Sequence, residues 1–122
     1  MSNWTYHQAN GELWYEDKLV SYGYSGLGAK ENNPGMQHVR GAGPIPQGVY
    51  QIGAPIDPPD RSGPLAMPLT HISGETFGRS GFFVQDASAW PSYAASEQGV
   101  TLLRAARVKM NASRPATLTV VP

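Results

Sequence analysis

The sequence predicts a small, mainly β domain, a sandwich or barrel of short strands with one main helix. Short apolar and aromatic runs alternate with segments rich in Gly and Pro, of which the 122-residue chain has 14 and 11. Asn10-Gly11 separates the first two aromatic runs, a pair typical of β-hairpins. Apolar residues at helical spacing occur in one segment near the C-terminus. The length fits one domain, residues 1–122.

The first three strands should form an antiparallel unit, because Asn10-Gly11 and Glu16-Asp17 supply two tight turns. Pro68 places a later strand at an edge or an end of the sheet, since proline lacks the N–H that a central strand donates. The expected strands are residues 4–8, 12–15, 18–24, 49–52, 65–69, 81–84 and 118–121.

The helix is expected over residues 100–110, where Val100, Leu103, Ala106 and Met110 share one face. Residues 25–47 are rich in Gly, Asn and Pro, which favour turns, so they predict a long irregular surface loop.

The composition excludes several classes of function. Nine basic residues balance nine acidic ones, so the chain lacks the positive charge that binds nucleic acid. The absence of Cys excludes disulfides, a thiolate nucleophile and Cys-based zinc sites. His7, His38 and His71 lack the spacing of metal ligands, and no phosphate-binding loop precedes the helix, so we expect neither a metal nor a cofactor.

The N-terminal residues show neither the basic start nor the apolar run of a secretory signal. No segment approaches the roughly 20 apolar residues of a membrane span. We therefore expect synthesis in the cytoplasm and, if the protein is exported, delivery by a secretion system or within a phage particle.

Two groups of residues are candidates for ligand binding from residue type alone. Arg79 and Ser80 precede an apolar strand and can either contact a ligand or serve as a salt bridge and turn cap. Trp90 and Tyr93 belong to a loop, where they can form an exposed aromatic cluster or pack over the sheet. Trp14 is expected in the core.

Several motifs, taken in order, resemble one family over nearly the whole chain. They are Gly11-Glu12-Leu13, Gly23-Tyr24-Ser25-Gly26, Asn32-Asn33-Pro34-Gly35, Gly43-Pro44-Ile45-Pro46-Gln47-Gly48, Phe77-Gly78-Arg79-Ser80-Gly81 and Ala95-Ser96-Glu97. The family is the L,D-transpeptidase/carboxypeptidase-related domain of type VI secretion peptidoglycan effectors. The resemblance implies a small L,D-transpeptidase-like β fold.

The resemblance also implies a catalytic pair that this chain lacks. In the family a cysteine thiolate attacks a bond of the peptidoglycan stem peptide, and a histidine acts as its base. The histidine position is occupied by Gln85, followed by Asp86, and the cysteine position by Gly99. Gln85 cannot accept a proton and Gly99 has no side chain, so the inherited mechanism is lost. Substitutes are conceivable in Ser96 and His71, although Ser96 is also a simple turn or cap residue.

Three hypotheses of function follow. In the first, an inactive relative binds a peptidoglycan stem peptide or serves as a scaffold; its ligand residues would be Arg79, Ser80, Gln85, Asp86, Trp90, Tyr93 and Ser96. In the second, the domain is a protein-interacting part of a phage-like particle or secretion machine. In the third, it is a divergent peptidoglycan hydrolase with a relocated Ser/His site. The partner is thus a stem peptide or another protein.

Overall fold

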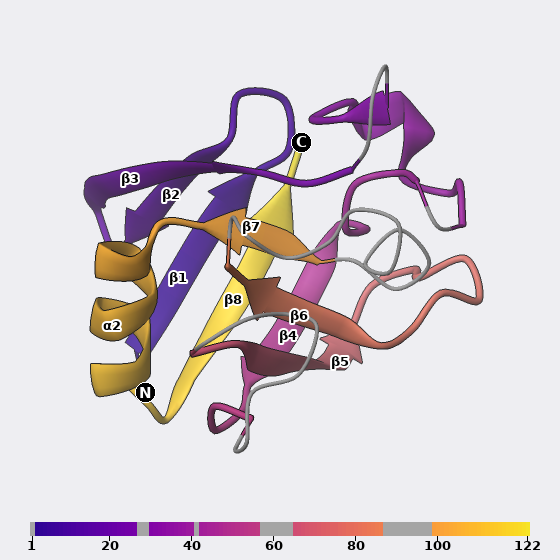
Figure 1. Cartoon of the computed structure of the whole chain (residues 1–122). Helices are drawn as coiled ribbons and strands as arrows, with labels where there is room; N and C mark the ends of the chain where they lie inside the picture. The colour runs from indigo at the N-terminus through magenta and orange to yellow at the C-terminus, as the bar shows by residue number, and fades with distance from the viewer. Residues whose placement is uncertain (1, 27–29, 41, 57–64, 87–98) are drawn as a thin grey trace.

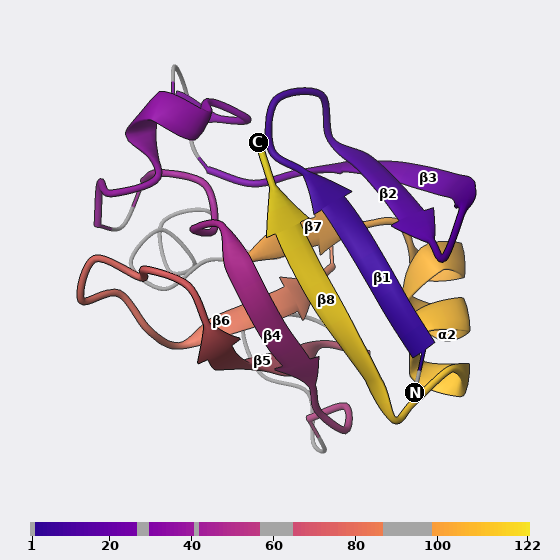
Figure 2. The same cartoon turned by 180° about the vertical axis from the view of Figure 1, so that it is seen from behind.

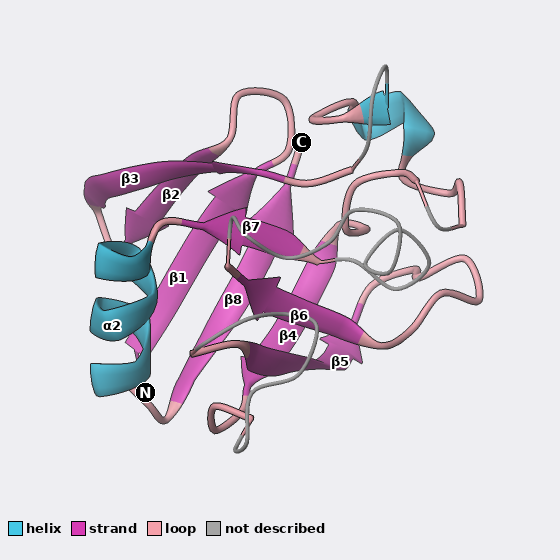
Figure 3. Cartoon of the chain, viewed as in Figure 1, coloured by secondary structure: helices cyan, strands magenta, loops and turns pink. Residues whose placement is uncertain are grey.

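The computed structural model describes residues 2–26, 30–40, 42–56, 65–86 and 99–122. Within them the chain forms eight strands, one α-helix and a 3₁₀ helix (Figures 1 and 3). The strands are β1 (Ser2–His7), β2 (Glu12–Tyr15), β3 (Lys18–Tyr24), β4 (Gly48–Ile52), β5 (Met67–Ser73), β6 (Phe82–Gln85), β7 (Val100–Leu102) and β8 (Ala116–Val121). The helices are η2 (Pro34–Met36) and α2 (Arg104–Ala112). The predicted mainly β fold with one main helix is confirmed.

The strands close into a barrel in the order β1-β2-β3-β7-β6-β5-β4-β8. The pairs β1–β8 and β6–β7 are parallel, and the other pairs are antiparallel. Figure 2 shows β8 lying between β1 and β4, so the last strand joins the two halves of the sheet. The predicted antiparallel unit β1-β2-β3 is confirmed.

The core follows the two-residue period of the strands. In β8, Ala116, Leu118 and Val120 are buried, while the residues between them are half-buried. Ala106 and Met110 of α2 join this core. Trp14 does not: it is half-buried, and its indole N–H donates to Glu12 Oε1 at 3.0 Å. The expectation of a core position for Trp14 was therefore wrong.

Two predicted elements have a boundary that moves by four residues. The helix begins at Arg104, since Val100–Leu102 forms β7 between β3 and β6. β5 runs on to Ser73 because β4 pairs with Thr70, His71 and Ser73. Pro68 is the second residue of β5, near the strand end as expected, but β5 is an interior strand.

The described part of residues 25–47 is not wholly a surface loop. Ser25, Pro44 and Ile45 are buried, while Asn33 caps the short helix η2 by accepting a hydrogen bond from the Gly35 N–H at 3.1 Å. Arg79 fixes this segment from the other side: its guanidinium donates to the carbonyl oxygens of residues 37, 43 and 44. Part of the segment is therefore packed against the rest of the fold rather than exposed on the surface.

Two buried tyrosines make the fold sensitive to alkali. Burial raises the pKa of Tyr6 and Tyr50 above their ordinary value near 10, and their hydroxyls donate to Asn32 Oδ1 and Pro46 O. Because the native state holds these protons more tightly, their contribution is complete below about pH 10 and is lost as the pH rises beyond it.

We therefore expect the free energy of unfolding to fall steeply above about pH 10, and the slope to be shallower in Tyr50→Phe. Urea unfolding at several pH values measures it. Tyr22→Phe is the control, because Tyr22 is 58% exposed. An equal slope in Tyr50→Phe and the control would contradict the assignment.

Candidate ligand-binding site

Gln85, which the resemblance matches to the family's histidine, is held inside the sheet. It ends β6, is 3% exposed, and pairs with Thr101 of the parallel strand β7. Its amide Nε2 donates to Thr101 Oγ1 at 3.1 Å. The amide thus joins two strands, and the predicted ligand contact by Gln85 is not favoured by this geometry.

Gly99, which the resemblance matches to the family's cysteine, lies directly against the backbone of β6. A Cβ added to it would be 2.0 Å from Phe83 O and 2.7 Å from Phe83 N. Such distances are far below van der Waals contact, so no side chain fits here without movement of the main chain. Glycine is therefore required here for a structural reason: it permits the backbone at residue 99 to approach the backbone of β6 closely.

Ser25 completes the buried surroundings of Gly99; it belongs to one of the sequence motifs but not to the candidate site residues. Its hydroxyl donates to Gly99 O at 2.5 Å and accepts from Ile45 N at 2.7 Å. The only signal for it in the sequence was a polar residue directly after a strand. Serine is common in turns, so this signal does not distinguish a buried contact from a turn. Its role is structural, because both contacts are with backbone atoms.

Asp86 is engaged by α2. Its carboxylate forms a salt bridge with Arg107, whose side chain is 1% exposed against 19% for that of Asp86. The Arg107 Nε also donates to Leu102 O at 3.1 Å. Burial lowers the pKa of Arg107, and the nearby Asp86 carboxylate opposes this effect. The pair ties the end of β6 to the helix.

Arg79 serves the fold rather than standing free for a ligand. Its side chain is buried, and its Nη1 donates to Gln37 O at 2.6 Å and Pro44 O at 2.7 Å. The guanidinium carbon lies 5.4 Å from the centre of the Phe82 ring. Of the two interpretations of Arg79, these contacts favour the structural one, in which the guanidinium anchors a turn through its carbonyl oxygens.

A polar depression of about 440 Å³ gathers three of the residues singled out from the sequence, His71, Arg79 and Ser80. Its other lining residues are Leu69, Thr70, Thr76, Gly81 and Phe82. His71 is exposed; its Nε2 lies 2.7 Å from Gly74 O, and its ring is 5.8 Å from that of Tyr50. Hydroxyl and imidazole groups therefore face one solvent-accessible hollow.

The predicted site residues thus divide into two groups. Phe82, which lines the depression, begins β6 and Gln85 ends it, a separation of roughly 10 Å along the strand. Arg79 and Ser80 belong to the polar depression, whereas Gln85 and Asp86 lie toward β7 and α2. Trp90, Tyr93 and Ser96 lie outside the described residues.

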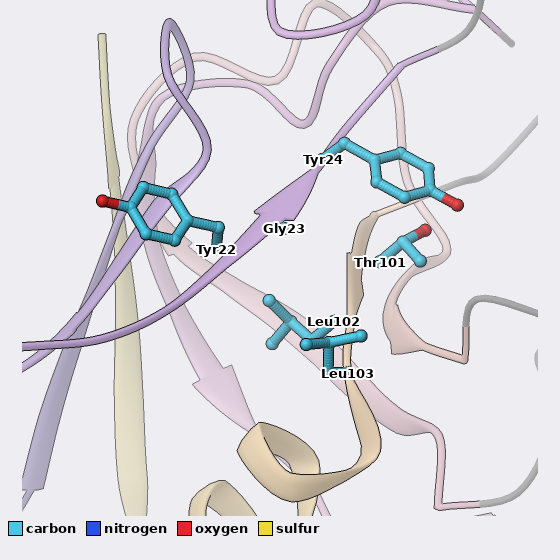
Figure 4. Close-up of a pocket in the computed structure, with 6 residues that line it drawn as sticks. All are labelled: Tyr22, Gly23, Tyr24, Thr101, Leu102 and Leu103. Atoms are coloured by element: carbon cyan, nitrogen blue, oxygen red, sulfur yellow. The ribbon is translucent and has the colours of Figure 1, made fainter.

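A second, apolar groove of about 270 Å³ lies where β3 meets β7 (Figure 4). We call it the β3–β7 groove; it is lined by Tyr22, Gly23, Tyr24, Thr101, Leu102 and Leu103. Tyr22 is 58% exposed and Leu103 is 62% exposed. Sequence reasoning did not identify this groove, because β7 was expected to be helical.

Among the described residues, no three His, Asp or Glu side chains gather as metal ligands would. No helix in the described ranges has the length and apolar character needed to cross a membrane.

No family model matches the chain, and no curated protein matches it. The relationship to the effector domains therefore stays a prediction from the motifs.

Proposed function

We propose that this domain is a non-catalytic relative of the L,D-transpeptidase/carboxypeptidase effector domains that binds a peptidoglycan stem peptide. One observation carries the proposal: at the position of the family's nucleophile, the backbone of Gly99 packs directly on that of Phe83. The position of the family's base is occupied by Gln85, whose amide is bonded to Thr101. Both positions of the lost pair thus serve the packing of β6 on β7.

The polar depression is the surface we assign to the ligand. A stem peptide offers amides and carboxylates, which need hydrogen-bond donors and acceptors. Thr70, His71, Thr76 and Ser80 supply hydroxyl and imidazole groups, while Leu69 and Phe82 supply apolar contact area. Hydrogen-bonding groups placed beside apolar contact area are what orients and holds a small ligand.

An NMR titration with the tripeptide L-Ala-γ-D-Glu-meso-diaminopimelate tests the proposal. We expect amide shifts at Thr70, His71 and Ser80 with a Kd of about 1 mM or below. Ser80→Leu, which fills the depression, should abolish them. His38→Gln is the control, because His38 is exposed and does not line the depression. Absence of shifts in these residues at several millimolar tripeptide would refute the assignment.

The same sample, with a tetrapeptide stem, tests the hydrolase hypothesis. A relocated site would release D-alanine over hours, and His71→Ala would stop the release. We expect no release. Gly74 O lies 2.7 Å from the His71 Nε2, and because a carbonyl oxygen only accepts, this nitrogen carries the proton and is not available as a base. Turnover that depends on His71 would replace the binding proposal by the enzymatic one.

A further inference from the structure

The strand β3 has an open edge along most of its length. On one side, β2 pairs with β3 from Lys18 to Tyr22. On the other side, β7 pairs only with Gly23 and Tyr24 before the chain turns into α2. Among the described strands, residues 18–22 therefore have a partner on one side only, as Figure 1 shows.

The side chains of this edge are accessible. Lys18 is exposed, Leu19 is 43% exposed and Tyr22 is 58% exposed. An edge strand presents a row of backbone N–H and C=O groups that an extended chain can pair with. The sequence of β3 lacks the ordinary safeguards against such pairing, a proline or several charges, since Lys18 is its one charged residue.

The β3–β7 groove continues this edge at the point where β7 leaves β3. Gly23 lets the two strands approach: a Cβ there would lie 2.4 Å from Thr101 O and 2.6 Å from Leu102 Cδ2. Figure 4 shows Tyr22 and Tyr24 extending to opposite sides of Gly23, with Leu102 and Leu103 next to it. The groove therefore offers an apolar contact surface for a side chain of a chain running along β3.

Charge favours an acidic residue near the groove. Arg104 follows Leu103 and is exposed, and α2 contains Arg104, Arg107 and Lys109 but no acidic residue. Arg107 forms a salt bridge with Asp86. At the end of α2 that adjoins the groove, the exposed cation is therefore Arg104. The acidic Glu16 and Asp17 lie at the opposite end of the edge, before Lys18. The two ends of the edge thus differ in charge: Arg104 lies beside the groove, and Glu16 and Asp17 lie at the other end.

We propose that the β3 edge binds an extended segment of a partner protein by strand addition, with an apolar side chain in the β3–β7 groove and an acidic residue beside Arg104. Regular strand pairing needs an all-L α-linked backbone, which a stem peptide with its γ-linked D-residue does not provide. This surface and its ligand are thus distinct from those of the proposed function, and either can fail without the other.

Two acetylated heptapeptides of alternating threonine and leucine, with a glutamate at one end or the other, serve as probes. Hydrogen exchange followed by NMR should show at least tenfold slower exchange of alternate amides within residues 18–22. The peptide methylated on alternate backbone nitrogens keeps its side chains but loses its donors, and it should give no protection. Equal protection by the methylated peptide, or none with either probe, would overturn the proposal.

Charge reversal tests the acidic end. Arg104→Glu should weaken the better probe by about tenfold, while Lys109→Glu, on the same helix but above the Tyr15 ring, should change it less than about twofold. Equal effects would remove the role of Arg104. Protection of residues 18–22 that rises with protein concentration in the absence of peptide would show a second copy on the edge, and would overturn the partner-protein proposal.

Discussion

Replacing Gly99 by cysteine is expected to destabilise the fold by more than about 3 kcal/mol and to confer no peptidase activity. The new Cβ would lie 2.0 Å from Phe83 O, so β6 and β7 would have to separate. That movement would also disturb the hydrogen bond that Ser25 donates to Gly99 O and the one between Gln85 and Thr101. The double variant Gln85→His/Gly99→Cys, which introduces the catalytic pair of the proposed family, should therefore be inactive on a tetrapeptide stem.

Urea unfolding followed by tryptophan fluorescence measures the loss of stability. Gly99→Ala should show nearly the same loss, because the clash arises at Cβ. Gly35→Ala is the matched control: a Cβ there meets only Asn33 Oδ1 at 3.4 Å, and the loss should stay below about 1 kcal/mol. A stable Gly99→Cys protein with a reactive thiol would show that the backbone at residue 99 can move away from β6. It would also reopen the catalytic interpretation.

Asp86→Ala is expected to reduce the free energy of unfolding by about 2–4 kcal/mol. The variant removes the carboxylate that faces the buried Arg107 guanidinium, whose side chain is 1% exposed. Arg107→Met should be less destabilising, at about 1–2 kcal/mol, because the 19% exposed Asp86 carboxylate can hydrate and methionine can fill the apolar space.

The order of these two losses, measured by urea unfolding at pH 7, is the test. Arg104→Met serves as control, since Arg104 is exposed on the same helix and its loss should change stability by less than about 0.5 kcal/mol. If Arg107→Met were the more destabilising variant, the hydrogen bonds of the guanidinium, such as that of Nε to Leu102 O, would contribute more than its pairing with Asp86.

Elements specified by neighbouring residues were predicted well. The bounds of β2 and β3 agree with the predicted ones because tight turns at Asn10-Gly11 and Glu16-Asp17 fix the hairpins locally. The alternating pattern of β8 was recognised for the same reason, although its first two residues were missed. In these places the two-residue period and the turn residues suffice.

Elements specified by distant partners were not predicted. Val100-Thr101-Leu102 fits an apolar helical face as well as a strand, and what decides is its pairing with β3 and β6. Thr70 to Ser73 looks polar in isolation and becomes strand because β4 lies beside it. The pattern of residues within a segment does not show which distant strand will lie beside it.

The site shows the same division. His71, Arg79 and Ser80 were singled out from sequence, and they do line one depression. Two other features depend on segments that are far apart in the chain. The Arg79 guanidinium donates to three carbonyl oxygens, and Gly99 packs against Phe83. The β3–β7 groove escaped notice because it depends on β7 being a strand.

The parallel pairing of β1 with β8 has a consequence for how the molecule folds. Trp4 lies beside Leu118 and Tyr6 beside Val120, so residues from opposite ends of the chain form neighbouring rungs of the barrel. Such contacts give a high contact order, which is associated with slow folding, because a long loop must close before the contacts form. During synthesis the aromatic residues of β1 would stay exposed until β8 has left the ribosome, and chaperones would have a substrate throughout that interval.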